Sequence, residues 1–385
     1  MSSKYAQLGV DVKKKGIESF REIVENAYPQ AFCVITKNLL FPNHGLVLHT
    51  DSAGTKQVQS YMNWKETGDL DSFKGLAQDV IAMNIDDIVC VGAKPISFVD
   101  YVALNRSRIP KEAFLEILNS DIVELRNLLE KYGILFPFDG GETADLPDQL
   151  STLDVSGFMQ GRVKLSEVVT GERIRPGNRI IGLRSGGKAR YEKKLNTGIM
   201  CNGITLARHC LLSPEYQNKY PEIYGGGALG YHGRFKVEDY LEELETTVGE
   251  AITSPTRIFA PIIVEVLKRM GPSITGLVHN TGGGQTKCMK LGRGLRYIKN
   301  TIPQPDPIFL LIQKESAESW RDMFQDYNIG LGFEVVVEED GVEPTIRIIE
   351  GFGVGATVVG EIQAGPPGNE VLIESSFGKF LYGST

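Results

Sequence analysis

Helical and strand-like apolar patterns alternate along this chain, and that alternation most restricts the folds it can adopt. Residues 111–132 place large apolar side chains three or four positions apart, which predicts an amphipathic helix ending at Gly133. Similar spacing predicts helices over 73–91 and 256–270. Strand-like runs occupy 45–51, 134–138, 153–158, 179–183, 308–312, 334–337 and 354–362. The mixture predicts an α/β protein of the α+β type.

The chain is too long for one hydrophobic core. At 385 residues it favours two domains. Residues 175–178 read Arg-Pro-Gly-Asn, a turn sequence, so we expect an N-terminal domain over 1–172 and a C-terminal domain over 173–385. Residues 212–249 are polar and rich in glycine and tyrosine, which predicts an extended surface insertion in the second domain.

Composition excludes several classes of protein. A net charge of −7 argues against a general nucleic-acid binder, which needs a basic surplus. No apolar run is long enough to span a bilayer and no signal peptide is evident, so we expect a cytoplasmic protein with no membrane partner. The five cysteines are scattered without metal-ligand spacing, and we interpret them as reduced thiols.

Four carboxylates form the strongest candidate constellation. Asp51 is expected at a strand end, Asp79 and Asp87 on one helix, and Glu142 after a turn at 139–141. Asp79 and Asp86 are seven positions apart and should share a helix face. Hard oxygen ligands suit Mg²⁺, which bridges phosphates. Each carboxylate alone is more often a solvated charge.

A histidine followed by glycines forms a second candidate. His279 has a side chain suited to general acid–base work, although a lone histidine is more often structural. Gly282, Gly283 and Gly284 would let backbone N–H groups approach an anion, but a glycine run is also a common turn. The basic segment 188–194 could attract a phosphate or be a solvated loop.

Taken together, these segments resemble a known family, aminoimidazole ribonucleotide synthetase, also called phosphoribosylformylglycinamidine cyclo-ligase. Residues 51–56 read DSAGTK and resemble the family's DGVGTK, and residues 140–147 read GGETADLP and resemble its GGETAEMP. The other matching segments are 5–11, 78–89, 254–258, 279–284, 328–332 and 359–362. The likeness therefore runs nearly from end to end.

The resemblance implies a fold, a partner and a reaction. Family members are two-domain subunits whose N-terminal strands pair with those of a second copy, forming a barrel across a homodimer. They use ATP and Mg²⁺ to phosphorylate the formyl oxygen of formylglycinamidine ribonucleotide. The amidine nitrogen then attacks, phosphate leaves and the imidazole ring closes. The phosphoryl group needs its charge offset, which is consistent with the acidic set.

The resemblance also implies roles for individual residues. Asp51, Asp79, Asp87 and Glu142 would hold the metal and nucleotide, with Gly54, Thr55 and Lys56 near the ATP phosphates. Glu142 and His279 are the catalytic candidates. Asn202 and Gly203, with the glycines at 282–284, would form the pocket for the ribonucleotide substrate.

The chain departs from the family pattern beside that pocket. Met200 stands where family members usually have a histidine, and residues 285–290 differ from the usual sequence after the glycines. We hypothesise that Lys188, Arg190 or Lys287 compensates for the lost substrate contacts.

Two alternatives stay open from the sequence. One is another ATP-dependent enzyme of the same superfamily, similar to selenophosphate synthetase or thiamine-phosphate kinase. The other is a nucleotide-binding scaffold without activity, suggested by Met200. Substrate-dependent ATP turnover distinguishes the three readings.

Overall fold

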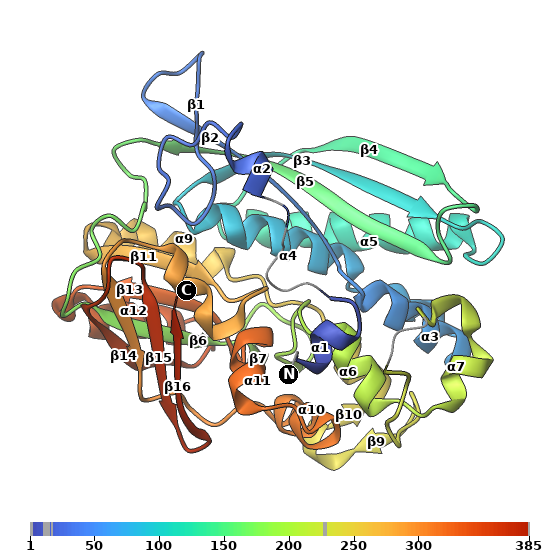
Figure 1. Cartoon of the computed structure of the whole chain (residues 1–385). Coiled ribbons are helices and arrows are strands. Elements are labelled where there is room, and N and C mark those ends of the chain that lie inside the picture. Colours follow the sequence, from blue (N-terminus) through green and yellow to red (C-terminus); the bar gives the residue numbers. More distant parts are fainter. Residues whose placement is uncertain (1–2, 11–15, 17, 226–228, 384–385) are drawn as a thin grey trace.

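Two large β-sheets and the helices packed on them build the molecule (Figure 1). The computed structural model describes residues 3–10, 16, 18–225 and 229–383. Asp11, the last residue of the first matching segment, lies outside them. One sheet uses strands from 36–164 and the other uses strands from 179–383. The expected class, a mixture of helices and mixed sheets, is confirmed, while the domain boundary at 172 and 173 stays a prediction.

The first sheet has five strands in the order β1-β2-β5-β3-β4. All neighbours are antiparallel except β3 and β4, which run parallel. Helices α4 and α5 lie along one face, and Figure 1 shows the opposite face of β3, β4 and β5 without a covering helix. The strands are β1 (Thr36–Lys37), β2 (His44–Ser52), β3 (Lys94–Leu104), β4 (Phe138–Asp145) and β5 (Leu153–Lys164).

The second sheet has seven strands in the order β11-β13-β6-β14-β12-β15-β16. Strand β13 (Leu331–Val337), between β11 and β6, is buried at every position. The remaining strands are β6 (Arg179–Arg184), β11 (Ile274–His279), β12 (Leu295–Lys299), β14 (Ala356–Ala364), β15 (Glu370–Ser375) and β16 (Gly378–Gly383). Two short ribbons pair β7 (Gly186–Gly187) with β8 (Asn196–Thr197) and β9 (Tyr240–Leu241) with β10 (Thr246–Thr247).

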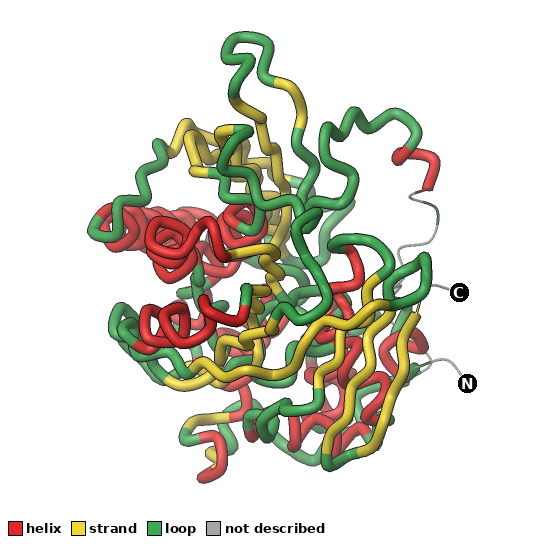
Figure 2. Tube along the Cα trace, turned by 90° about the vertical axis from the view of Figure 1, so that its left-hand side faces the viewer, coloured by secondary structure: helices red, strands yellow, loops and turns green. Residues whose placement is uncertain are grey.

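Helix α4 (Leu76–Val89) connects the two sheet layers. It packs on β2 and β5 on one side and on α9 (Ala260–Met270) on the other, and Figure 2 shows helices between the strands of the two sheets. The other helices are α1 (Lys4–Gln7), α2 (Glu18–Arg21), α3 (Lys56–Thr67), α5 (Lys111–Glu130), α6 (Ile204–Leu211), α7 (Glu215–Lys219), α8 (Val248–Thr253), α10 (Pro307–Ser316), α11 (Trp320–Asp326) and α12 (Val342–Glu350). Among the described residues, none of these helices combines the length and apolar character that crossing a membrane requires.

Several sequence predictions are confirmed. Helix α5 buries the apolar stripe expected of residues 111–132. Strands β2, β5, β6 and β13 cover the predicted runs at 45–51, 153–158, 179–183 and 334–337, and β14 covers the run at 354–362 from residue 356 onward. The helix expected over 73–91 is α4, which is shorter at both ends, and the one expected from 256 begins at Ala260.

The strand expected at 308–312 is wrong, because these residues lie in helix α10. Pro307 opens the helix, where a missing N–H costs nothing. Ile308, Phe309, Leu311 and Ile312 are buried, whereas Leu310 between them is 39% exposed. A short apolar run fits a buried strand and a helix equally well, so its periodicity could not decide.

The turn expected at 139–141 is also wrong, as is the strand at 134–137 before it. Strand β4 begins at Phe138 and continues through Gly141 and Glu142. Its pairing with β3 shifts register between Phe98 and Asp100. A Cβ on Gly141 would lie 1.8 Å from Asp100 Oδ1, so this position requires glycine for close packing and not for a turn.

The segment 212–249, of which 226–228 lie outside the described residues, is not simply a surface extension. Tyr216, Tyr231 and Val237 are buried, and Tyr231 stacks on His209 of α6 with ring centroids 4.5 Å apart. The Tyr216 hydroxyl accepts a hydrogen bond from the Val237 backbone N–H at 3.0 Å. Aromatic residues in this segment therefore pack into the core, which a polar composition did not indicate.

Asp326, at the end of α11, predicts a dependence of stability on pH. Burial, with Asp322 and Glu318 nearby, raises the pKa of its carboxyl to about 7. Since the folded pKa exceeds the unfolded value, stability falls as pH rises from about 4 to about 7. Asp326→Asn should raise the free energy of unfolding at pH 8 by about 1–3 kcal/mol and have little effect at pH 4.

Urea unfolding followed by circular dichroism at the two pH values measures this difference. Asp340→Asn, at an exposed position, is the control. An Asp326→Asn effect of equal size at both pH values would contradict the assignment.

Candidate active site

Asp79 is fully buried in an ion pair that joins three segments. Its Oδ1 accepts hydrogen bonds from Lys56 Nζ at 2.7 Å and from the backbone N–H and hydroxyl of Thr256 at 2.8 and 2.7 Å. Lys56 Nζ also donates to the Ser254 carbonyl at 2.7 Å. Lys56 Nζ and Asp79 Oδ1 are thus occupied by protein groups, whereas Asp79 Oδ2 is buried without a hydrogen-bond partner among the described residues. The predicted roles of the two side chains in holding metal and ATP stay predictions.

Asp86 faces the same way as Asp79, as their spacing predicts. Its two carboxylate oxygens accept the backbone N–H groups of Phe259 and Ala260 at 2.9 and 2.7 Å. These donors lie at the start of α9, where N–H groups lack partners within the helix. Burial raises the pKa of Asp86 well above its ordinary value. Asp86 therefore caps a helix that belongs to the second half of the chain.

Asp87 points to a different set of partners. Its Oδ1 accepts a hydrogen bond from His279 Nδ1 at 2.7 Å, and its Oδ2 lies 3.2 Å from His49 Nε2. Lys287 Nζ is 3.9 Å from the same Oδ2. Burial opposes ionisation, but Lys287 and the two imidazoles outweigh it and hold the pKa of Asp87 well below its usual range. The carboxylate is therefore ionised at neutral pH.

His279 is fully buried at the end of β11. Its ring stacks on Phe333 with centroids 5.9 Å apart, and its Nε2 has no hydrogen-bond partner among the described residues. Burial lowers its pKa, although the bond to Asp87 opposes the shift. A neutral imidazole held against Asp87 can orient that carboxylate, whereas direct contact with a substrate would need an opening of the structure.

Asp51 lies near Asp87, at the end of β2. It is half-buried, and its Oδ1 accepts the Ser52 backbone N–H at 2.8 Å. Burial raises its pKa, and the charge of Asp87 adds to that increase. His49 stands two residues earlier on the strand. The structure thus brings Asp51, Asp87 and His279 together.

The loop after β2 meets the start of α6. The hydroxyls of Thr55 and Thr205 are 2.9 Å apart, and Arg208 Nη1 donates to the Thr55 carbonyl at 3.3 Å. A Cβ on Gly54 would lie 3.4 Å from the Cys201 carbonyl. The residues predicted to bind ATP phosphates are therefore adjacent to those predicted to bind the substrate.

The predicted substrate residues also lie together. A Cβ on Gly282 would be 3.7 Å from Asn202 Oδ1, so these two segments meet. Tyr327 donates a hydrogen bond to the Gly203 carbonyl at 2.8 Å, and its ring would lie 2.0 Å from a Cβ on Gly203. The left-handed φ of 74° at Gly203 also favours glycine. Gly284 packs against the Tyr327 backbone, with Gly283 just before it.

Met200, which stands where family members usually have a histidine, lies in the core. It is fully buried with a left-handed φ of 58°, and its sulfur points toward Gly332 and Phe259. The side chain is therefore part of the hydrophobic core. Of the three basic residues proposed to compensate, Lys287 is beside Asp87, whereas Lys188 and Arg190 are exposed near Gly353.

Glu142 lies away from the other three carboxylates. In the sheet register, Ser52 pairs with Ser156, Ser156 with Tyr101, and Tyr101 with Glu142. Three strand spacings separate Ser52 from Glu142, which is about 14 Å. Among the described residues, the side chains that could share one metal ion are Cys33, His49 and Asp87. Asp51, Asp79, Asp87 and Glu142 therefore do not form one metal cluster within this chain.

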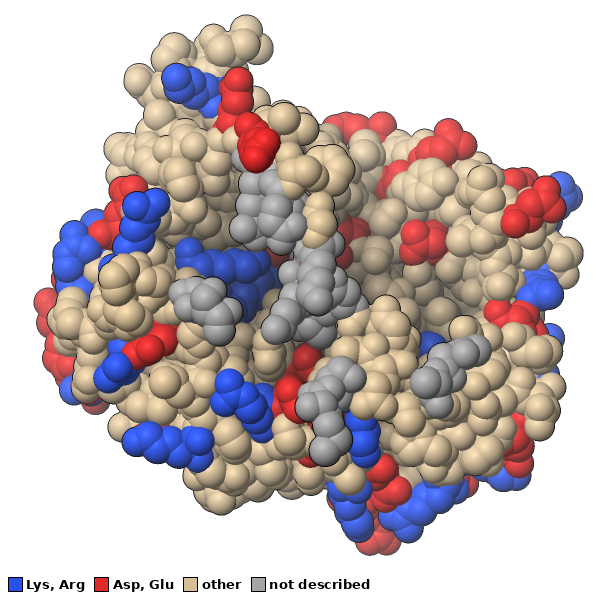
Figure 3. Space-filling view, viewed as in Figure 1, with Lys and Arg blue, Asp and Glu red and all other residues tan. Residues whose placement is uncertain are grey.

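Figure 3 shows a hollow between the layer of the five-stranded sheet and the rest of the chain, with Lys and Arg side chains gathered on its wall.

The sequence interpretation missed His49, the capping role of Asp86, and Tyr327. The spacing of His49 and Asp51 on one strand face was available as a signal. Nothing local in the sequence indicates that Asp86 reaches α9 or that Tyr327 reaches Gly203.

Several solved structures share this fold, one of them a complex with AMPPCP. AaThiL complexed with AMPPCP and TMP superposes with a TM-score of 0.57 at 10% identity, covering 95% of each chain. T. maritima PurL complexed with FGAR gives 0.56 at 13% identity over 95% of this chain and 49% of that chain. The hydrogenase maturation protein HypE gives 0.55 at 12% identity, covering 94% and 95%. The chain therefore has the fold of these proteins.

Sequence comparisons define the family. Residues 33–163 match the model described as "AIR synthase related protein, N-terminal domain". A phosphoribosylformylglycinamidine cyclo-ligase of Methanococcus maripaludis is 32% identical over 327 residues, covering 84% of this chain and 79% of the relative. That of Pyrococcus furiosus is 33% identical over 361 residues, covering 90% and 92%. The chain belongs to the phosphoribosylformylglycinamidine cyclo-ligase family, and the suggested resemblance is confirmed.

Variants of the Lys56–Asp79 pair distinguish a role in stability from a role in binding ATP. Lys56→Met leaves a buried carboxylate without its cation, which should cost about 3–5 kcal/mol of unfolding free energy. Adding Asp79→Asn removes the unpaired charge and should restore much of that stability. Chemical denaturation of the two variants and the wild type measures this. If Lys56→Met unfolds like the wild type but raises the KM for ATP, the ammonium serves the nucleotide instead.

Proposed function

We propose that this chain catalyses the ATP-dependent closure of formylglycinamidine ribonucleotide to aminoimidazole ribonucleotide, a step of purine biosynthesis. The proposal is supported by family membership and by one structural observation. The Asp51–Asp87 group, the Gly54–Thr55 loop and the Asn202–Gly203 turn lie at one junction between the two sheets. The ligands would be ATP, Mg²⁺ and the ribonucleotide, and we expect the enzyme to work in the cytoplasm.

The chemistry of the carboxylates fits a magnesium ion. Asp51 and Asp87 are partly desolvated and repel each other, and a divalent cation between them would relieve that repulsion. We infer that these two side chains hold Mg²⁺. When bound, the ion supplies charge compensation for the phosphoryl group that moves from ATP to the formyl oxygen.

The chain's own residues would orient the reaction. Ionised Asp87 is held on one side by His279 and on the other by His49, so its carboxylate has little freedom to rotate. We propose that His279 positions Asp87 and that Lys287, beside it, stabilises negative charge. The exposed Thr55 and Gly282 flank the junction and would face the nucleotide and the ribonucleotide. Phosphorylation converts a poor leaving group into phosphate, and ring closure follows.

Asp87→Asn tests the proposed metal role. We expect kcat for ATP turnover in the presence of formylglycinamidine ribonucleotide to fall roughly 10²–10³-fold. Removing one group that stabilises charge in a transition state has an effect of this size. Asp71→Asn, an exposed carboxylate paired with Lys74, is the control. Coupled ADP release and the appearance of aminoimidazole ribonucleotide measure the rates. Wild-type rates from Asp87→Asn, or turnover that does not require the ribonucleotide, would contradict the proposal.

We also propose a homodimer in which the open face of the five-stranded sheet contacts a second copy. Leu48, Tyr101 and Phe158 are 49%, 39% and 37% exposed on β2, β3 and β5. Phe158 pairs with Thr50 and Val99, so its neighbours in the register come from both adjoining strands. Strand β4 has a free edge that could pair with a partner strand and complete a barrel. Exposed Glu142 on β4 would then need the partner to reach a site.

Phe158→Glu should convert the dimer to a monomer, because it places a charge in an apolar contact. Light scattering after size exclusion would give the mass of one chain, 42.4 kDa, for the variant and twice that for the wild type. Val123→Glu, exposed on α5, is the matched control. A wild-type protein with the mass of one chain at micromolar concentration would contradict the proposed dimer.

A further inference from the structure

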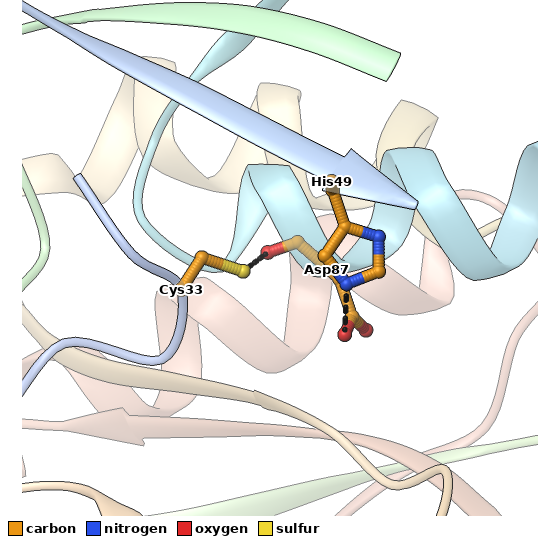
Figure 4. A group of neighbouring side chains, drawn as sticks. All are labelled: Cys33, His49 and Asp87. Carbon is orange, nitrogen blue, oxygen red and sulfur yellow. Dashed lines mark hydrogen bonds and ion pairs between the residues drawn. The ribbon is translucent and has the colours of Figure 1, made fainter. Parts of the chain in front are cut away.

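Three side chains from separate segments converge beside the proposed magnesium site (Figure 4). Cys33 precedes β1, His49 lies on β2 and Asp87 lies on α4. One ligand atom from each lies within 4.8 Å of the other two, and among the described residues no other such group occurs. Cysteine, histidine and aspartate together form a donor set that suits zinc-like ions and not Mg²⁺.

The amide of Asn84 determines which nitrogen of His49 is available. Asn84 Nδ2 donates to the carbonyls of Val80 at 2.9 Å and Asp51 at 3.3 Å, so its Oδ1 must face His49. That oxygen lies 3.1 Å from His49 Nδ1, which therefore carries a proton. His49 Nε2 is left facing Asp87 Oδ2 at 3.2 Å. Metal-binding histidines are oriented in the same way by a bond from their second nitrogen.

The Cys33 thiol completes the group. It is 8% exposed and donates to the Asp87 backbone carbonyl at 3.0 Å. Ligands on a tetrahedral zinc ion lie about 3.3–3.8 Å apart, so contraction by about 1 Å would close the site. Burial raises the pKa of the thiol, which remains protonated without a cation. Metal binding would release this proton and any proton on His49 Nε2, without a change of oxidation state.

We propose that Cys33 Sγ, His49 Nε2 and Asp87 Oδ2 bind one thiophilic divalent cation of the zinc class, leaving a fourth position open. Only the expected effect on ATP turnover rests on the proposed function; the metal site itself does not. Since Asp87 is shared with the magnesium site, occupation by zinc should inhibit ATP turnover. The site would thus make the enzyme sensitive to the balance of the two metals.

Removing the charge of Lys287 tests whether a cation binds beside Asp87, because the change should strengthen binding. Its ammonium is 3.9 Å from Asp87 Oδ2 and opposes any cation there, whereas the Asp51 carboxylate favours one. Lys287→Gln should therefore tighten binding at least about tenfold, because a unit positive charge roughly 4 Å from a divalent ion repels it by more than this even at the dielectric of water. A cation bound far from Lys287 would not respond in this way.

Titration of the metal-free full-length protein with Co²⁺ tests the proposal directly. A thiolate bound to Co²⁺ gives a near-ultraviolet charge-transfer band. We expect this band at one Co²⁺ per chain in the wild type, its loss in Cys33→Ala, and weaker binding in His49→Gln. Cys210→Ala removes another buried thiol, remote on α6, and should keep the band. Circular dichroism of each variant confirms that it is folded.

Absence of the band in the wild type, or its persistence in Cys33→Ala, would overturn the proposal. If Cys33→Ala fails to fold, loss of Co²⁺ affinity in His49→Gln and tighter binding in Lys287→Gln decide instead, and unchanged affinities would overturn it. The titration uses no substrate, so its outcome is independent of the proposed catalytic activity. Zn²⁺ should inhibit ATP turnover of the wild type more strongly than that of Cys33→Ala.

Discussion

Two buried carboxylates on helix α4, Asp79 and Asp86, hold the two halves of this molecule together. Asp79 binds Lys56 and Thr256, and Asp86 caps the start of α9. Buried charges are costly unless paired and hydrogen-bonded, so these contacts specify one arrangement of the N-terminal sheet against the 254–260 segment. The position of every ligand-facing loop depends on that arrangement, because Thr55, Asn202 and Gly282 come from different parts of the chain.

Helix α4 carries structural carboxylates on one face and the proposed metal-binding carboxylate, Asp87, on another. Asp79 and Asp86 share one face and contact the second half of the chain, whereas Asp87, one residue on, turns toward Asp51, His49 and His279. Burial raises the pKa of Asp86, but cationic neighbours keep Asp87 ionised. One turn of helix thus carries both a cap for another helix and a charged group suited to a metal.

The sequence predicted elements whose periodicity is unambiguous and failed where contacts are long-range. Helix α5 and strands β2, β5 and β6 follow from local patterns, whereas the short apolar run of α10 suits a strand and a helix equally. The resemblance implies one metal set of Asp51, Asp79, Asp87 and Glu142. The structure places Asp51 near Asp87, whereas Asp79 pairs with Lys56 and Glu142 lies on β4, because strand order cannot be read from spacing. The Cys33–His49–Asp87 group was invisible for the same reason, because its members are scattered in the chain.

In the proposed mechanism, Asp51 and Asp87 hold the divalent ion that accompanies the nucleotide. Anomalous diffraction from a crystal of the protein with Mn²⁺ and a non-hydrolysable ATP analogue tests it most directly. We predict a manganese peak within bonding distance of both carboxylates, with Asp79 still paired to Lys56. A peak bound by Asp79 in place of Asp51 and Asp87, with Lys56 displaced toward the phosphates, would contradict it.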